Sequence, residues 1–254
     1  MKKNTLIFST ALVLVSLLFF SFKNWNSTPI NEAQVINKEL PDLYYGVGPR
    51  FATINKTKLD KSTSIYDFLN EGEKNQIDQF ESVEIVVIKD ERQTAISAFG
   101  KHENLTNAQL KLLRSLDYFN HFAIRTHFKG KNKDTGKLED RFFNPHITIV
   151  PDHQATYENG EKALINYFKE KSSEAVSIIR GDNLGAVMLY FTVTKDGLIS
   201  NIYQKRMSTG YPSIDEKFKQ LIKNIPGKWS PAENDKGEKI DQELVFTFGP
   251  ANGC

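Results

Sequence analysis

The stretch PGKWSPA, residues 226–232, separates an amphipathic segment from the last strand-like run of the sequence. Pro226 and Gly227 predict the end of a helix, because proline lacks the N–H that a helix needs and glycine favours the turn that follows. Trp229 lies between prolines that fix the backbone, and large aromatic side chains usually bury most of their surface. We therefore expect Trp229 to form a structural corner rather than a surface contact.

Regular elements are predicted on both sides of this corner. Ser213 and Glu216 have the spacing of a capping box at the start of a helix. Further upstream, Val187, Leu189, Phe191 and Val193 occupy alternate positions, and residues 198–207 return after an Asp-Gly turn, which predicts a hairpin. The apolar positions are Ile214, Phe218, Leu221, Ile222 and Ile225 in this helix and Leu244, Phe246 and Phe248 in a final strand, and an earlier helix is expected from Glu158 to Lys171.

Several motifs follow one another in this region: Gly185-x-Val187, Val193–Asn201, Ser213–Asp215, Pro226–Ala232 and Val245–Phe248, after a lead-in at Tyr157–Leu164. In order and spacing they resemble the C-terminal domain of TonB-family energy transducers over residues 157–249. The resemblance implies a helix–hairpin–helix–strand fold in a periplasmic domain tethered to the inner membrane of a Gram-negative bacterium. It also implies that this domain binds an extended segment of an outer-membrane transporter.

Such binding is strand addition, in which a peptide completes the hydrogen-bond ladder of an unpaired sheet edge. In the family the strand after the second helix receives the partner. The backbone and the outward side chains of that strand would meet the partner, whereas Leu244, Phe246 and Phe248 are expected in the core. The resemblance carries the partner-binding edge over to Gln242, Glu243, Leu244, Val245, Phe246 and Thr247.

The N-terminus predicts export. Lys2 and Lys3 precede an 18-residue apolar run from Thr5 to Phe22, which as a helix spans roughly 27 Å, close to the hydrocarbon thickness of a bilayer. We favour an uncleaved anchor over a signal peptide, because no Ala-x-Ala precedes a cleavage point. The lysines place that end in the cytoplasm. The expected location is the inner membrane, single-pass, with the bulk of the chain in the periplasm, or secretion to the periplasm if the segment is cleaved.

The sequence as a whole predicts an α+β protein of two small domains. Ahead of the TonB-like region, residues 83–99 indicate a hairpin and Thr106 with Gln109 a capped helix. Residues 122–128 and 147–150 indicate two further strands. The expected organisation is a membrane anchor or signal segment at 1–23, a linker at 24–43, an N-terminal α+β domain at 44–153 and a TonB C-terminal-like domain at 157–254.

The N-terminal domain parallels the second in its order of hairpin, helix, turn-rich segment and strand. Residues 131–137 correspond in this comparison to residues 234–239. A degenerate duplication would explain the parallel, and so would coincidence, because this arrangement of elements is common.

Some departures from the family argue against energy transduction. Classical transducers cross the periplasm on a long proline-rich spacer, whereas only Pro29, Pro41 and Pro49 occur in the first 50 residues here. The apolar run at residues 5–22 also has no histidine or carboxylate that would couple it to a proton-driven motor. Binding is therefore expected without motor coupling.

Other classes of function find little support in the sequence. The formal net charge is +2, which gives no field for nucleic acid, and the only cysteine is Cys254, which excludes an intrachain disulfide. No Gly-x-Ser-x-Gly elbow or phosphate-binding loop occurs, so we expect no enzyme and no cofactor. A metal site is disfavoured because the candidate histidines lack ligand spacing. These histidines are His121, His127, His146 and His153.

Two hypotheses follow from the sequence. The first is a membrane-anchored TonB-like protein that captures an extended segment of an envelope protein partner, such as an outer-membrane receptor. The second is a non-enzymatic envelope scaffold that self-associates through the same sheet edge.

Overall fold

The computed structural model describes residues 41–180 and 184–252, which belong to one compact unit. The predicted anchor at 1–23 and all but the last residues of the linker lie outside the described residues. Among the residues described, no helix has the length and apolar character needed to span a membrane. The unit has two hydrophobic cores, each built on its own sheet, and the predicted α+β class is confirmed.

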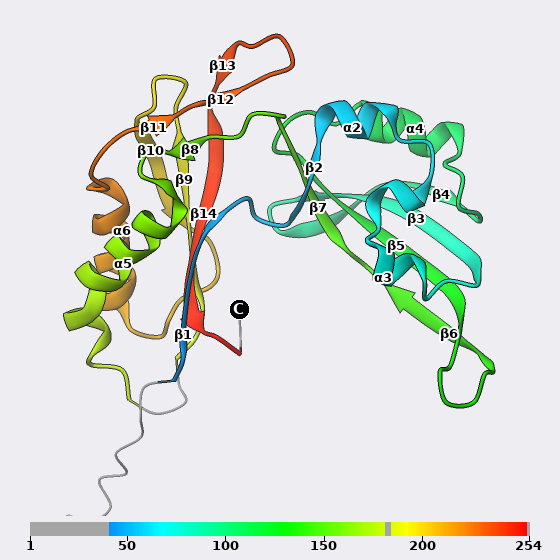
Figure 1. Ribbon diagram of the computed structural model, residues 1–254, viewed down its shortest axis with the longest axis horizontal. Helices are drawn as coiled ribbons and strands as arrows, with labels where there is room; N and C mark the ends of the chain where they lie inside the picture. Colours follow the sequence, from blue (N-terminus) through cyan, green and yellow to red (C-terminus); the bar gives the residue numbers. More distant parts are fainter. Residues whose placement is uncertain (1–40, 181–183, 253–254) are drawn as a thin grey trace, which may run out of the picture. The chain divides into compact units, whose positions relative to one another are not determined.

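The C-terminal core lies between an antiparallel sheet and two helices (Figure 1). The strand order is β1-β14-β9-β10, and helices α5 and α6 cover one face. The alternation seen in the sequence explains this arrangement, since Val187, Leu189, Phe191 and Val193 all point into the core. The elements are β1 (Leu43–Gly48), α5 (Gly160–Val176), β9 (Val187–Val193), β10 (Ile199–Gln204), α6 (Pro212–Lys223) and β14 (Gln242–Pro250).

The predicted capping box of α6 is wrong. The helix begins at Pro212, and its N-cap residue Tyr211 makes no side-chain capping bond. Proline is pre-organised for the first helical position, so Ser213 lies inside the first turn, where it cannot cap. Instead, the buried Asp215 carboxylate accepts hydrogen bonds from the backbone N–H of Thr209 at 3.1 Å and from its hydroxyl at 2.6 Å.

The corner predicted at Trp229 is confirmed. The Trp229 side chain is 7% exposed and packs on Tyr157 and Phe191, with ring centroids 5.5 and 5.9 Å away. Its strand β11 (Trp229–Ser230) pairs with β8 (Thr156–Tyr157), which brings the chain before α5 beside the chain after α6. A second short pair, β12 (Ala232–Glu233) with β13 (Lys239–Ile240), leads into β14.

Gly197 in the β9–β10 turn is expected to be more sensitive than another glycine of similar conformation. Gly197 has φ +76°, and a Cβ there would lie 2.4 Å from the Trp229 carbonyl oxygen, whereas Gly237 has φ +74° and open space around it. Replacing Gly237 by alanine should therefore cost only the conformational term, about 1 kcal/mol. Gly197→Ala adds a backbone clash and should cost about 3 kcal/mol in urea unfolding. Equal losses in the two variants would contradict the close approach at Trp229.

The N-terminal core lies on one face of a six-stranded sheet of order β2-β7-β5-β3-β4, with β6 paired to β5 (Figure 1). The capping box predicted at Thr106 and Gln109 is present at the start of α4. The predicted strands are also present, although β5 and β3 are longer than the pattern indicated. The strands are β2 (Ala52–Asn55), β3 (Gln79–Lys89), β4 (Arg92–Gly100), β5 (His121–Lys131), β6 (Leu138–Phe143) and β7 (His146–Val150), and the helices are α2 (Lys56–Lys61), η2 (Ile65–Phe68), α3 (Glu71–Lys74) and α4 (Asn107–Arg114).

The segment Leu43–Gly48, which opens the predicted N-terminal domain, does not join the N-terminal sheet. As β1 it pairs with β14 in the C-terminal sheet. The chain enters the N-terminal sheet only at β2, beyond Pro49. The C-terminal sheet is therefore built from both ends of the described chain.

The two sheets share part of their topology. In each, a hairpin is followed by a helix and then by a strand that pairs with the first hairpin strand, giving the orders β4-β3-β5 and β10-β9-β14. The equivalence of the turn-rich segments is wrong, because residues 131–137 follow β5 whereas residues 234–239 precede β14. Duplication stays a hypothesis that rests on the shared strand order alone.

Candidate functional site

The strand predicted to bind a partner is β14. All six residues of the predicted edge, Gln242 to Thr247, lie in it. Leu244, Phe246 and Phe248 point into the core, as expected, and are at most 3% exposed. Val245 on the opposite face is also buried, at 4% exposed, so it is less accessible than the sequence suggested.

β14 is not an open edge along its whole length, and this part of the prediction is wrong. On one side it pairs with β9, and on the other Val245, Phe246 and Thr247 pair with Gly48, Val47 and Gly46 of β1. A distant segment of the same chain therefore occupies the side where the partner was expected. Binding of a partner at these residues stays a prediction, which now has to account for β1.

One aromatic side chain fixes β1 to the core. The ring of Tyr45 packs edge-on against Phe248 at 5.0 Å and Phe218 at 6.1 Å. Its hydroxyl lies 3.4 Å from the Ser172 hydroxyl, and the Lys169 ammonium lies 5.7 Å from its ring centre. The neighbouring Tyr44 is 45% exposed. Leu43 and Val47 also pack against the C-terminal core, so three alternate side chains and the backbone ladder hold the strand.

The direction of the β14 backbone groups follows from the ladder. The Ala251 N–H donates to the Asp42 carbonyl at 2.7 Å, in register with the β1–β14 pairs. Because antiparallel strands bond alternate residues to the same neighbour, Val245 and Thr247 also direct N–H and C=O toward β1. The next residue of this set is Glu243, but the pairing with β1 ends at Gly48 and Val245. Glu243 therefore faces a position that β1 leaves open.

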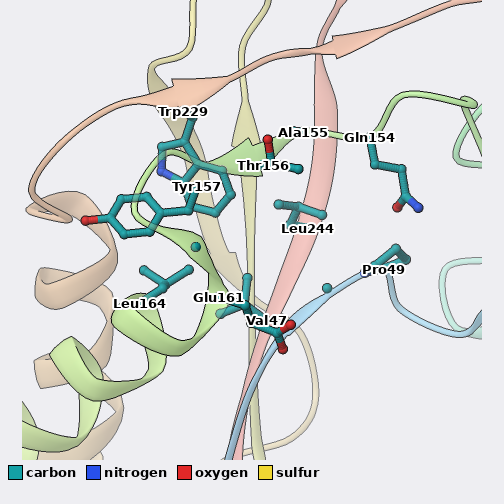
Figure 2. Close-up of a pocket in the computed structure, with 12 residues that line it drawn as sticks. Val47, Pro49, Gln154, Ala155, Thr156, Tyr157, Glu161, Leu164, Trp229 and Leu244 are labelled. Atoms are coloured by element: carbon teal, nitrogen blue, oxygen red, sulfur yellow. The ribbon is translucent and has the colours of Figure 1, made fainter.

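A cavity of about 330 Å³ lies next to this position, where Leu244 of β14 lines it (Figure 2). Its apolar walls include Val47 of β1, Leu244 of β14 and Leu164 of α5, with Tyr157 and Trp229 from the β8–β11 pair. Gln154 and Glu161 supply polar groups to the lining. The cavity is thus an apolar continuation of the strand position held by β1, on the face of the sheet that the helices cover.

The other outer strand of the C-terminal sheet is a poorer site for strand addition. The pairing of β10 with β9 shifts register between Ser200 and Tyr203, and Asn201 has φ +49°. Such bulges twist an edge away from incoming strands. The β14 side is therefore the better candidate of the two.

Glu91 forms a polar joint between the two sheets. From the β3–β4 turn, its carboxylate accepts hydrogen bonds from the Tyr190 hydroxyl at 2.5 Å and the Arg50 Nε at 2.9 Å, and Lys205 Nζ lies 3.5 Å away. Burial tends to raise the pKa of Glu91, but the Tyr190 hydrogen bond and the Arg50 charge outweigh burial and lower it. Arg50 lies two residues beyond the end of β1, so the hydrogen bond from Arg50 to Glu91 fixes the chain just after this strand.

The four histidines considered for a metal site do not come together in the structure. His121 and His146 flank the Phe51 ring, with centroids 5.3 and 5.0 Å from it, and burial lowers the pKa of His121 to about 4. His127 packs on Phe142, while the backbone of His153 bridges to Glu233. Within the described residues, no group of three or more metal-ligating side chains converges.

Sequence reasoning missed β1, the cavity and the Glu91 joint. Comparison of the chain with protein-family models, curated proteins and solved structures finds no match.

Proposed function

We propose that this chain is a membrane-anchored periplasmic TonB-like binding protein, which engages an extended segment of an envelope partner by β-strand addition to β14. The partner segment takes the position that β1 holds in the free protein. Membrane anchoring rests on the N-terminal sequence, Lys2-Lys3 and the apolar run to Phe22. Motor coupling is not part of the proposal, because the sequence lacks the spacer and the ionisable anchor residue.

The observation that carries the proposal is the way in which β1 is bound. A segment remote in sequence adds to β14 through six consecutive residue pairs, from Leu43 with Pro250 to Gly48 with Val245. The ladder and the alternate side chains of Leu43, Tyr45 and Val47 together hold it, as in recognition of an extended peptide. This side of β14 therefore accepts a strand that presents apolar side chains to the core at alternate positions.

The element order is consistent with the TonB resemblance. A helix, a hairpin, a second helix and a strand follow one another as α5, β9–β10, α6 and β14. The last strand lies beside the first hairpin strand, with β1 on its other side. The resemblance implies that the partner binds at this last strand, whose other side β9 occupies.

β1 has to be displaced for capture to occur. A tethered strand competes at an effective concentration on the order of millimolar, so a partner needs better contacts than β1 offers. Gly46 and Gly48 weaken β1, because glycine loses more conformational freedom in a strand than other residues and contributes no side-chain packing. The strand is thus suited to exchange.

The test is a pull-down from the envelope fraction of the protein's own cells with the full chain as bait. We expect an envelope protein to be retained and to be lost with Val245→Pro, because proline removes the N–H that faces the added strand but leaves the bonds to β9. Val245→Thr keeps the shape and the N–H and should retain the partner.

Retention of the same proteins by Val245→Pro as by the wild type would contradict strand addition at β14. Recovery of the bait alone would favour the second hypothesis, an envelope scaffold whose copies associate by exchanging β1.

A further inference from the structure

We propose that the captured segment carries apolar side chains at three alternate positions, and that the third enters the cavity beside Trp229 that β1 leaves empty. This inference rests on the proposed function and specifies the class of peptide that the β14 site takes. The first two positions are those that Tyr45 and Val47 occupy in β1, where both side chains pack against the core, as does Leu43 two residues earlier.

Strand geometry places the third position over the cavity. Side chains alternate between the faces of a strand, so a residue two beyond the Val47 position points to the same helix-covered face. By continuation of the register, that residue lies opposite Leu244, which lines the cavity. In this chain the residue there is Pro49, just beyond the end of β1 and at the cavity's edge, after which the chain leaves for β2 (Figure 2).

The cavity is suited to a large aliphatic or aromatic side chain. Its volume is about 330 Å³, and Leu164, Leu244 and Trp229 give it apolar walls. The Trp229 indole is itself buried, and its Nε1–H has no hydrogen-bond partner among the described residues. Against the apolar walls a polar side chain at the third position would lose hydration on entering.

A segment that continues straight past the third position also gains backbone bonds that β1 cannot make. Its next residue lies opposite Glu243, whose N–H and C=O face that side of β14. The apolar side chain in the cavity and the backbone hydrogen bonds to Glu243 are the contacts through which a partner binds more tightly than the tethered β1. Burial of one large apolar side chain alone strengthens binding about tenfold or more.

Synthetic peptides test the inference on the full chain carrying Tyr45→Ala, which weakens its own β1. The probe has the sequence of Leu43–Gly48 followed by leucine, lysine and serine, and a second peptide has serine in place of that leucine. We expect the leucine peptide to bind about tenfold or more tightly in fluorescence anisotropy. The matched control moves the leucine to the preceding position, equivalent to Gly48, which points to the other face and should bring no gain.

Placement is checked by a photo-reactive leucine at the third position, which should cross-link to the segments that contain Leu164 or Trp229. Equal affinity of the leucine and serine peptides, or cross-links elsewhere, would overturn the inference and leave strand addition standing. Failure of all the peptides to bind would overturn strand addition at β14 and the inference with it.

Discussion

A disulfide between β1 and β14 is expected to abolish partner capture. Gly48 and Val245 lie opposite each other, and directly opposed residues of a bonded antiparallel pair have Cα atoms about 5.5 Å apart, within disulfide range. A Cβ at Gly48 meets nothing within 4 Å. In Gly48→Cys/Val245→Cys, with Cys254→Ser to prevent mispairing, the oxidised protein should bind an envelope partner more than about a hundredfold more weakly, because the open state is no longer populated.

The same sample provides the control for this prediction. Reduction should restore capture to the level of the Cys254→Ser protein, which separates the effect of locking from that of the substitutions. Undiminished capture by the oxidised protein would show that β1 does not have to leave, and a partner site elsewhere would then have to be sought.

A substitution that loosens β1 is expected to raise the affinity for the partner, whereas the disulfide lowers it. Tyr45→Ala removes the aromatic anchor of β1, which packs on Phe248 and Phe218. Loss of a partly buried aromatic costs about 2 kcal/mol, so the open state should be populated roughly 30-fold more and apparent affinity for the partner should rise by up to that factor. The measurement is a binding titration with the envelope partner or with the leucine peptide.

Tyr44→Ala is the matched control, since Tyr44 is the adjacent tyrosine and is 45% exposed. It should leave affinity nearly unchanged. If Tyr45→Ala weakens capture, Tyr45 supports the site itself rather than competing for it.

The elements that strong periodicity marked were predictable. Val187, Leu189, Phe191 and Val193 occupy alternate positions, and α6 repeats its apolar residues on one face, so burial of these side chains favours both elements. The start of α6 was mispredicted, because Pro212 takes the first helical position and the helix has no side-chain cap, while Asp215 instead accepts hydrogen bonds from Thr209 in the preceding loop. The local sequence did not indicate that Thr209 would form hydrogen bonds with Asp215.

β1 could not be recognised as part of the C-terminal sheet. Gly46 and Gly48 occur near Pro49 and favoured a turn over a strand, and the pairing with β14 joins segments from the two ends of the described chain. The cavity was equally hidden, because Val47, Leu164, Trp229 and Leu244 come together only in the folded protein. Sequence patterns report local periodicity, whereas both features depend on long-range pairing.

The most direct test of the central claim is backbone amide hydrogen exchange with and without a bound partner segment. In the free protein the N–H groups of Tyr44, Gly46 and Gly48 face β14 and should be protected, whereas those of Tyr45 and Val47 face away. If the partner replaces β1, protection at Tyr44, Gly46 and Gly48 is lost while Val245 and Thr247 stay protected. Continued protection of Gly46 and Gly48, with new protection at Tyr45 and Val47, would mean that the partner adds outside β1 and would contradict the exchange.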